Sequence, residues 1–509
     1  MTLSRVDSAA FFALDAIPIH IEVDVNPSQE KLNLLIVGLP DSAVRESKDR
    51  VLAAIKNSGY RIGNIRCTIN LAPGSLKKEG PLYDLPIALG LLSSLGIVKH
   101  ELLKEYLILG ELGLGGELQP MQGALAITLL AKKLGKKGVI LPHANAAEAS
   151  TVSNIHLLAV KNLKEAIHYL HNPSSVPKQK NTITDDYFHQ IPPPIDFSEI
   201  KGQVHTKRAM EIAAAGNHNI LLSGPPGSGK TMLAKALVGI MPELTVEESL
   251  EITKIHSITG LLPKGQSLVT QRPFRSPHHT ISYAGLIGGG TIPSPGEVAL
   301  AHNGILFLDE LPEFSRTTLE VLRQPLEDHQ VTISRANGRF TYSTNFLCIA
   351  AMNPCPCGYL SHPDKTCSDT ELQINRYRNK ISGPLLDRID MHIEVPALRY
   401  SDFTRQNIGE QSSTIRSRVK AARKQQKRRF GPRENNSTIS LKRLKESSTL
   451  CSSSKELLRQ AIDSLGISAR GYNKILRVAR TIADLASSDQ IQHQHLLEAM
   501  NFRQTPPPS

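Results

Sequence analysis

One stretch near the middle of the chain carries the residues best suited to hold a nucleotide. Its pattern is Gly-x4-Gly-Lys-Thr, and residues without bulky side chains let backbone N–H groups approach a phosphate closely. In this pattern Lys230 would reach the outer phosphates, and the Thr231 hydroxyl would hold Mg²⁺. The predicted binding loop for a nucleoside triphosphate consists of Gly224, Pro225, Pro226, Gly227, Ser228, Gly229, Lys230 and Thr231.

Two further apolar runs end in polar residues that would complete a hydrolytic site. Residues 304–308 are mostly apolar and lead into Asp309 and Glu310, which suits a buried parallel strand that delivers carboxylates at its end. Asp309 would bind Mg²⁺, and Glu310 would orient and deprotonate the attacking water. Another apolar run ends at Asn353, whose amide could hold the same water. We therefore predict that three strand ends converge on one reaction.

These side chains need a parallel sheet to position them, and the chain is long enough for several domains. A length of 509 residues suggests roughly three or four domains. We expect an α/β domain at 1–171, a Pro- and Ser-rich linker at 172–196, an α/β ATPase core at 197–395 and a helical domain at 396–509.

Composition limits the class of protein. The chain is 40% apolar and 21% charged, as in globular proteins, and its net charge of +12 favours a polyanionic partner. Six cysteines are too few for a disulfide scaffold, which favours a reducing compartment. The sequence shows neither a signal peptide nor an apolar run of the roughly 18 residues that span a bilayer. We expect a cytoplasmic protein that does not cross a membrane.

The first domain contains two segments that resemble the proteolytic domain of Lon, a ribosomal-S5-like fold. They are residues 78–86 and residues 110–133. In Lon the first segment carries a nucleophilic serine and the second a lysine base. The matching positions here are Leu82 and Leu125, which can neither attack a carbonyl nor accept a proton. The resemblance therefore implies a Lon-like fold without peptidase chemistry.

Several rare strings together carry a wider resemblance over nearly the whole chain. They are 275–280 (RSPHHT), 288–290 (GGG), 309–314 (DELPEF) and 353–358 (NPCPCG). With them the chain resembles the YifB/ComM family of magnesium-chelatase-like AAA+ ATPases. The resemblance implies a homo-hexameric ring that hydrolyses ATP and acts on single-stranded or branched DNA. The implied role is a ComM-like helicase that promotes branch migration during homologous recombination in natural transformation, with recombination proteins as further partners. The alternative is a magnesium-chelatase- or MoxR-like remodeller or chaperone that does not translocate on DNA.

Two arginines gain a role from this resemblance. Arg388 follows an apolar turn and by itself reads as a surface cation, whereas in AAA+ ATPases this position holds the arginine finger that reaches the neighbouring subunit's ATP. Residues 468–480 match the lid helix of the magnesium-chelatase and MoxR branches, where Arg470 would be the sensor arginine that touches the γ-phosphate in cis.

Two basic elements fit a DNA partner. Residues 330–342 form two alternating runs joined by Asn-Gly, the strongest short hairpin signal, with Arg335 and Arg339 beside the tip. A plain surface hairpin explains the same residues. Residues 414–433 carry nine Lys or Arg and no acid, which favours a phosphate-tracking segment over an ordinary solvated helix. The candidate DNA contacts are Arg335, Arg339, Arg423, Lys424, Lys427, Arg428 and Arg429.

A cysteine-rich loop at 355–369 resembles a zinc-like cluster that many family members close with a fourth cysteine. Here Cys355, Cys357 and Cys367 are present, and Asp369 stands at the fourth position. Three thiolates with Asp369, or with His362, could complete a tetrahedral zinc site. A metal-free loop is the alternative.

Overall fold

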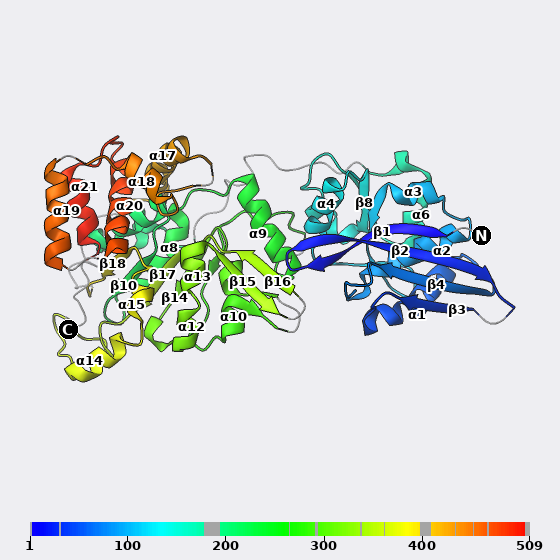
Figure 1. Ribbon diagram of the computed structural model, residues 1–509, viewed down its shortest axis with the longest axis horizontal. Coiled ribbons are helices and arrows are strands. Elements are labelled where there is room, and N and C mark those ends of the chain that lie inside the picture. Colours follow the sequence, from blue (N-terminus) through cyan, green and yellow to red (C-terminus); the bar gives the residue numbers. More distant parts are fainter. Residues whose placement is uncertain are drawn as a thin grey trace. The chain divides into compact units, whose positions relative to one another are not determined.

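The protein folds into two compact units (Figure 1). One unit comprises Met1–Tyr187 together with Val246–Thr270, and the other comprises Phe188–Thr245 together with Gln271–Ser509. The structure is a computed structural model that describes residues 3–29, 32–177, 194–263, 265–290, 294–335, 338–360, 362–397, 409–432, 434–450, 452–465 and 468–503. Residues 178–193 of the expected linker therefore lie outside the described residues.

The first unit is built on two sheets that helices cover. The larger sheet has the order β1-β2-β4-β3, and its strands are β1 (Ser4–Phe12), β2 (Asp15–Pro27), β4 (Ile65–Ala72) and β3 (Asn33–Val37). The smaller sheet is parallel and consists of β5 (Tyr106–Ile108), β8 (Gly138–Pro142) and β9 (His156–Val160). A short hairpin joins β6 (Glu111–Leu112) to β7 (Leu118–Gln119). The helices are α1 (Ser42–Asn57), α2 (Asp84–Ser94), α3 (His100–Lys104), α4 (Ala124–Lys133), α5 (Ala146–Ala149) and α6 (Leu163–His171).

The two positions that match the Lon dyad lie in apolar surroundings. Leu82 is in the short 3-10 turn Pro81–Tyr83 and packs against an apolar cluster, and the Leu125 side chain is fully buried in α4. The backbone N–H of Leu125 donates to Glu148 Oε1 at 2.7 Å. Both leucines thus serve packing in this unit.

A helix from the middle of the chain belongs to the first unit. Helix α9 (Val246–Ile258) lies within the range 197–395, where we expected a continuous ATPase core. It packs on α4 instead, and the backbone N–H of Gly123 donates to Ser257 Oγ at 2.8 Å. Regular helical periodicity gives no sign of this, because an amphipathic helix can bury its apolar face against either unit.

The second unit is organised by a five-stranded parallel sheet (Figure 1). Its order is β11-β14-β17-β10-β18, and the strands are β11 (Phe274–Arg275), β14 (Ile305–Leu308), β17 (Leu347–Met352), β10 (Ile220–Ser223) and β18 (Met391–Glu394). The three central strands are almost entirely buried, as in a sheet covered on both faces. Two short strands, β12 (Gly288–Gly289) and β13 (Ser294–Pro295), pair beside it. The helices before the C-terminal segment are α7 (Val204–Gly216), α8 (Lys230–Leu237), α10 (Tyr283–Ile287), α11 (Glu297–Leu300), α12 (Arg316–Glu320), α13 (Arg323–Asp328), α14 (Glu371–Arg378) and α15 (Gly383–Leu386).

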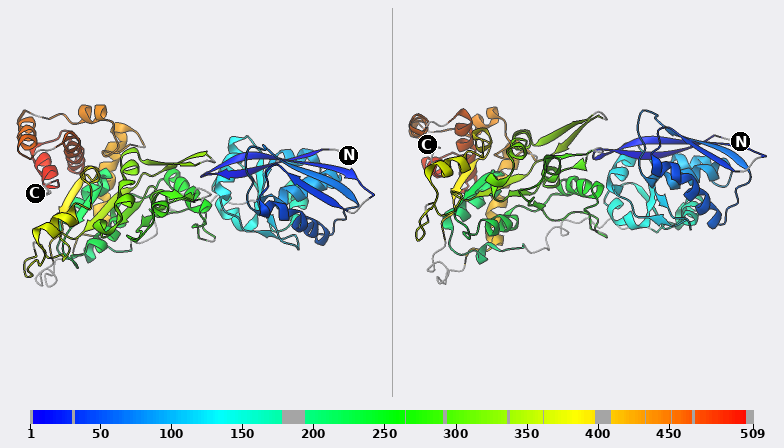
Figure 2. Two further views of the ribbon diagram at one scale, coloured as in Figure 1. Left: turned by 60° about the horizontal axis from the view of Figure 1, so that its bottom comes forward. Right: turned by 90° about the horizontal axis from the view of Figure 1, so that it is seen from below.

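The predicted hairpin is present as a separate two-stranded ribbon (Figure 2). Strands β15 (Gln330–Arg335) and β16 (Gly338–Ser343) pair antiparallel, with Ser334 opposite Arg339. Residues 336 and 337 at its tip lie outside the described residues, and so does the side chain of Arg335.

The C-terminal helices share one core with the sheet. They are α17 (Ser412–Phe430), α18 (Leu441–Ser447), α19 (Ser452–Leu465), α20 (Ala469–Leu485) and α21 (His493–Asn501). Apolar residues of α20 such as Ile475 and Ile482 join the cluster that contains β10. Polar contacts add to this packing: His218 Nε2 lies 2.7 Å from Thr481 Oγ1, and the fully buried Arg480 pairs with Asp484 at 3.0 Å. None of the described helices is long and apolar enough to cross a membrane.

Candidate functional site

The glycine-rich loop connects β10 to α8 at the carboxyl end of the sheet. Gly227 and Gly229 adopt φ values of +76° and +87°, a region that favours glycine. A Cβ on Gly224 would lie 2.2 Å from the backbone oxygen of Val395, so this position also needs glycine. The loop therefore has the backbone that close approach to a phosphate requires.

Lys230 is buried beneath this loop and binds to it. Its Nζ donates to the backbone oxygens of Gly224 at 2.6 Å and Pro225 at 2.9 Å, and to Asn353 Oδ1 at 3.3 Å. Burial lowers the pKa of Lys230, although Asp309 and Glu310 oppose that shift. The contact with Asn353 brings the end of β17 to the loop, where the sequence predicts it.

The two acids of β14 reach the same place. Thr231 Oγ1 donates to Asp309 Oδ2 at 2.9 Å, so the two predicted Mg²⁺ ligands already touch. Glu310 follows with a positive φ of +51°, and its carboxylate is more than half exposed at 58%. The three adjacent strands are parallel and in register, with Ser223 opposite Met352 and Leu308 opposite Ala350, which explains why their ends meet.

His279 is a neighbour of Glu310 that sequence reasoning left without a role. Its Nδ1 lies 3.4 Å from Glu310 Oε2, and its ring is tilted by 33° against that of His278, with centroids 4.1 Å apart. Strand β11 pairs with β14, so residues after β11 reach the same carboxyl end. The signal was the His-His string, but residue spacing alone does not bring position 279 beside position 310.

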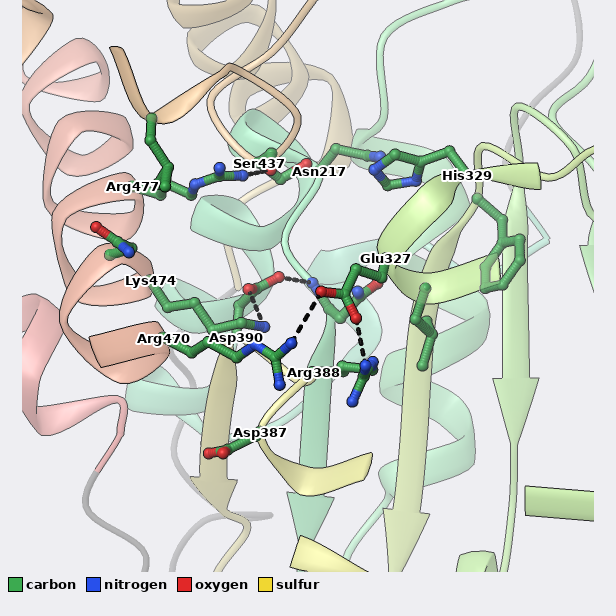
Figure 3. A pocket seen from close by; sticks show the side chains of 15 residues that line it. Asn217, Glu327, His329, Asp387, Arg388, Asp390, Ser437, Arg470, Lys474 and Arg477 are labelled. Carbon is green, nitrogen blue, oxygen red and sulfur yellow. Dashed lines mark hydrogen bonds and ion pairs between the residues drawn. The ribbon is translucent and has the colours of Figure 1, made fainter. Parts of the chain in front are cut away.

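Arg388 and Arg470 lie at the opposite end of the sheet. Arg388 comes just before β18, whose first residue Met391 is paired with Ile220, the first residue of β10. Arg470 Nη2 donates to Glu327 Oε1 at 3.2 Å, and Arg388 Nη2 donates to Glu327 Oε2 (Figure 3). The length of β10, about 13 Å at ~3.3 Å per residue, therefore separates them from the loop.

This placement corrects the expectation that Arg470 touches the γ-phosphate in cis. Helix α20 buries its apolar face against the core, and its first turn then faces the amino ends of the strands, not the loop (Figure 3). A cavity of about 300 Å³ lies there, lined by both arginines and by Glu327, Asp390 and Lys474. Lys474 Nζ pairs with Asp390 at 2.7 Å. Burial raises the pKa of Asp390, but Lys474 and other partners outweigh burial and the net pKa is lowered.

Comparison with known proteins agrees with this architecture. Three family models match: magnesium chelatase, subunit ChlI, at residues 196–403; subunit ChlI of Mg-chelatase at 21–145; and magnesium chelatase, subunit ChlI C-terminal, at 409–503. The chain is 41% identical to the uncharacterized protein YifB of Escherichia coli, over 99% of this chain and 97% of YifB. It is 40% identical to the competence protein ComM of Haemophilus influenzae, over 99% of this chain and 98% of ComM.

The chain belongs to the YifB/ComM family. The resemblance drawn from the sequence motifs is thereby confirmed, as is a magnesium-chelatase-like AAA+ fold with a parallel sheet. Membership in this AAA+ family also indicates an ATPase that uses ATP and Mg²⁺. A more distant similarity links the chain to Lon protease 2 of Bacillus subtilis, with 27% identity over 31% of each chain.

The cysteine-rich loop of this YifB/ComM family member forms a compact ligand set. The sulfurs of Cys355, Cys357 and Cys367 lie 3.4–3.6 Å apart, and all four ligand atoms, including one from Asp369, lie within 4.8 Å of one another. A tetrahedral zinc ion with bonds of about 2.3 Å to sulfur needs sulfurs roughly 3.8 Å apart, so the donor set fits zinc.

The alternative zinc ligand, His362, makes other hydrogen bonds. Its Nδ1 accepts from the backbone N–H groups of Asp364 and Lys365, each at 3.1 Å. The loop also contacts the nucleotide site, because a Cβ on Gly358 would lie 2.6 Å from Pro226 Cδ. A metal held by Cys355, Cys357, Cys367 and Asp369 would thus stiffen the support of the phosphate loop.

The basic segment of this family member differs from the expected open surface. Arg423 Nη2 donates to the backbone oxygen of Ala214 at 3.1 Å, and Arg429 pairs with Asp484 at 2.8 Å. These two candidate DNA contacts therefore hold α17 against the core. The aliphatic stems of long cations can lie on the inward side of an amphipathic helix when backbone oxygens and acids pair with their charged ends. Arg433 lies outside the described residues.

Three of the candidate cations on α17 remain directed to solvent. Lys424, Lys427 and Arg428 are exposed, as is Arg339 on the hairpin. The surface available for a polyanion is thus narrower than the sequence suggests. Among the candidate DNA contacts whose side chains the structure describes, these four are the exposed ones.

Proposed function

We propose that this chain is an ATP-hydrolysing motor that acts on DNA, a ComM-like helicase that promotes branch migration during homologous recombination. The observation that carries the proposal is the division of the hydrolytic groups between the two ends of one sheet. Loop, acids and Asn353 lie at one end, and Arg388 and Arg470 lie at the other. Such a division supports a site that is completed only by a neighbouring subunit, hence a homo-hexameric ring.

At the carboxyl end, this chain's own residues would bind ATP and activate water. The loop and Lys230 would hold the phosphates, with Thr231 and Asp309 as ligands of Mg²⁺, which neutralises phosphate charge when bound. Glu310 would take a proton from the attacking water while the water oxygen bonds to the γ-phosphorus. The bond from the γ-phosphorus to the β,γ-bridging oxygen breaks, which releases ADP. Asn353 would hold that water.

His279 would orient the base in this scheme. A side chain that is 58% exposed, as Glu310 is, needs a partner to stay in one position. The imidazole of His279, 3.4 Å away, can be that partner. A shift of the segment that carries His279 would alter its contact with Glu310. We place His279 in the role of a positioning residue for Glu310.

At the amino end, the two arginines would serve the ATP of a neighbouring subunit. Positive charge on the transferring phosphoryl group stabilises the transition state, and an arginine supplied in trans contributes about 10³- to 10⁵-fold in rate. Arg388 and Arg470 contact the same carboxylate, so a phosphate that meets one would meet the other. Both therefore act in trans in this proposal.

DNA is the partner that the exposed cations favour. Arg339 on β16 and the three solvent-directed cations of α17 can neutralise phosphates without reading bases. Similarity to a protein named for competence supports DNA taken up in transformation as the substrate. Single-stranded or branched DNA suits such sequence-independent contacts.

The test is ATP hydrolysis with and without single-stranded and branched DNA. We expect DNA to stimulate hydrolysis, and we expect the double variant Arg335→Ala/Arg339→Ala to lose that stimulation while basal hydrolysis persists. Lys132→Ala/Lys133→Ala, which removes two exposed lysines of α4, is the matched control and should keep it. Hydrolysis that is indifferent to DNA, or stimulated equally in the hairpin variant, contradicts the proposal.

The second candidate is a magnesium-chelatase- or MoxR-like remodeller. The family models, which bear the name of magnesium chelatase subunit ChlI, favour it. Such a protein would hydrolyse ATP in a ring yet show no DNA stimulation and no unwinding of branched DNA. The same assay therefore separates the two candidates.

The first unit would be a binding platform with a Lon-like fold rather than a peptidase. Similarity to Lon protease 2 supports the fold, and Leu82 and Leu125 support the absence of the dyad. The purified protein should leave an unfolded substrate such as casein intact in the presence of ATP. Degradation that depends on ATP would show that the dyad lies elsewhere.

A further inference from the structure

A single carboxylate holds the two arginines together. Glu327 lies near the end of α13, Arg388 follows α15, and Arg470 is in the first turn of α20, so three separate elements meet there (Figure 3). Each oxygen of Glu327 accepts from a different guanidinium, Oε2 from Arg388 and Oε1 from Arg470 at 3.2 Å. The motifs of the sequence give Glu327 no role, since it belongs to none of them.

We propose that Glu327 is a positioning residue that makes Arg388 and Arg470 act as one pair in hydrolysis. The inference rests on the proposed function, in which both arginines serve the neighbouring subunit's ATP. Two guanidinium groups this close repel each other unless a negative charge lies between them. Glu327 supplies that charge.

The Glu327 carboxylate, which accepts from both arginines, lets the better-fixed Arg388 restrict the position of Arg470. Arg388 is well fixed: its side chain is 15% exposed, and its Nη1 also donates to the backbone oxygen of Pro384 at 2.8 Å. The Arg470 side chain is 57% exposed and would sample many rotamers by itself. Through Glu327 the exposed arginine takes its position from the fixed one.

The bridge leaves both arginines able to bind a phosphate. A guanidinium has five N–H donors. Glu327 takes one from each arginine, Pro384 takes another from Arg388, and the Arg388 Nε is buried, so four donors of Arg470 and two on the terminal nitrogens of Arg388 remain for an anion. The other acids that line the cavity have their own cations: Asp390 pairs with Lys474 at 2.7 Å and Asp387 with Arg503 at 3.6 Å. Among the described residues, Glu327 is the acid whose pairing with Arg388 and Arg470 is observed.

The test uses Glu327→Gln, which keeps the shape and removes the charge, in the full chain at saturating protein and ATP. Loss of a charge-assisted hydrogen bond predicts a kcat about 10-fold lower, with KM for ATP unchanged because the loop binds nucleotide in cis. In an Arg470→Ala background, the same substitution should lower kcat less than about 2-fold, since the pair no longer exists. Glu327→Asp should recover part of the rate.

Two controls separate positioning from folding. Glu456→Gln removes a carboxylate that pairs with Arg459 on the surface of α19, and it should leave kcat unchanged. The melting temperature of Glu327→Gln should stay close to that of the wild type, because the Glu327 side chain is 45% exposed and the Gln amide oxygen can still accept from the less exposed Arg388.

Three results would overturn the inference. They are a wild-type kcat in Glu327→Gln, an equal loss in both backgrounds, and a loss explained by a lower melting temperature. If Arg388→Ala and Arg470→Ala themselves leave kcat unchanged, the proposed role of the arginines fails along with it. If those two variants are impaired and Glu327→Gln is not, only the role of Glu327 fails.

Discussion

In the proposed mechanism, the two ends of the five-stranded sheet carry opposite halves of one chemistry. At the carboxyl end, Lys230 donates to the loop's own backbone oxygens and Thr231 donates to Asp309. At the amino end, Arg388 and Arg470 share the carboxylate of Glu327, within the same compact unit. In the proposed mechanism, one end has the groups that would bind nucleotide and activate water, and the other has the cations that would stabilise the phosphoryl transfer.

The difference shows that one subunit can contain all the residues of a catalytic site without bringing them together in one place. Parallel strands bring their carboxyl ends together, so the loop, the acids and Asn353 must meet in one subunit. The arginines precede β18 and start α20, which the same topology places at the other edge. In the proposed mechanism, a second subunit joins the two ends.

The largest effect should come from the carboxyl end. Lys230→Ala removes the cation that meets the phosphates, and we expect nucleotide binding to fall at least ~100-fold, the size of a lost charge-assisted contact in a buried site. Titration with a fluorescent nucleotide measures this. Lys235→Ala, an exposed lysine of the same helix, is the control and should bind normally. Normal affinity in Lys230→Ala would remove the loop from the account.

The amino end should affect rate and spare binding. Arg388→Ala and Arg470→Ala should each lower kcat by roughly 10² to 10³, at or below the lower range for arginines supplied in trans, while nucleotide affinity stays within ~3-fold of the wild type. Steady-state hydrolysis combined with the binding titration distinguishes the two ends. An arginine variant that loses affinity and keeps its rate would place that arginine at the nucleotide of its own subunit.

The cysteine-rich loop offers a test of how the carboxyl end is supported. We expect about one zinc per chain by elemental analysis of the purified protein. Asp369→Ala should weaken zinc binding by at least the ~10-fold that loss of an outer-shell partner costs. His362→Ala should retain zinc, because its Nδ1 accepts backbone N–H groups instead. Zinc that is lost from the His362 variant and kept in the Asp369 variant would reverse the ligand assignment.

The smallest expected effect is that of acid on the free energy of unfolding, through His218 at the amino end of the sheet. Burial lowers the pKa of His218, beside Thr481, to about 4, whereas an unfolded histidine titrates near 6.5. The unfolded chain therefore binds the extra proton first, so stability is complete above about pH 6.5 and declines as pH falls towards 4. At pH 5 the loss from this group should be on the order of 2 kcal/mol.

Urea unfolding of the second unit at several pH values measures that loss. His218→Asn should make the pH dependence between pH 7 and 5 less steep, and His392, whose pKa burial also lowers to about 4, should keep part of it. His143→Gln, which changes an exposed histidine of the first unit, should leave the pH dependence unchanged. An equally steep pH dependence without His218 would show that other groups carry it.

Much of the carboxyl end could be predicted from sequence because its residues follow short apolar strands directly. Position along the chain then fixes position in space, as it does for Thr231, Asp309 and Asn353. The residues at the amino end were harder to predict from the sequence. Arg470 was assigned to the wrong end because the orientation of α20 depends on its long-range packing against the sheet. Glu327 and His279 had no role at all, since their partners are distant in sequence.

The basic segment shows a related limit. Lys and Arg content predicted a helix with an open cationic surface, yet Arg423 and Arg429 face an oxygen of α7 and the carboxylate of Asp484. Which side of a helix faces the core follows from its apolar positions, Ile415, Val419 and Ala422. Those positions were visible in the sequence, but the acceptors opposite them were not.

The most direct test of the central claim is subunit mixing. Glu310→Gln should bind ATP without hydrolysing it and still offer its arginines, whereas Arg388→Ala/Arg470→Ala keeps the base and lacks the arginines. Each should be nearly inactive alone. The account predicts that mixing them restores hydrolysis, with a maximum at intermediate ratios, because each variant supplies the end that the other lacks. Activity that stays at the level of the separate variants at every ratio would contradict it.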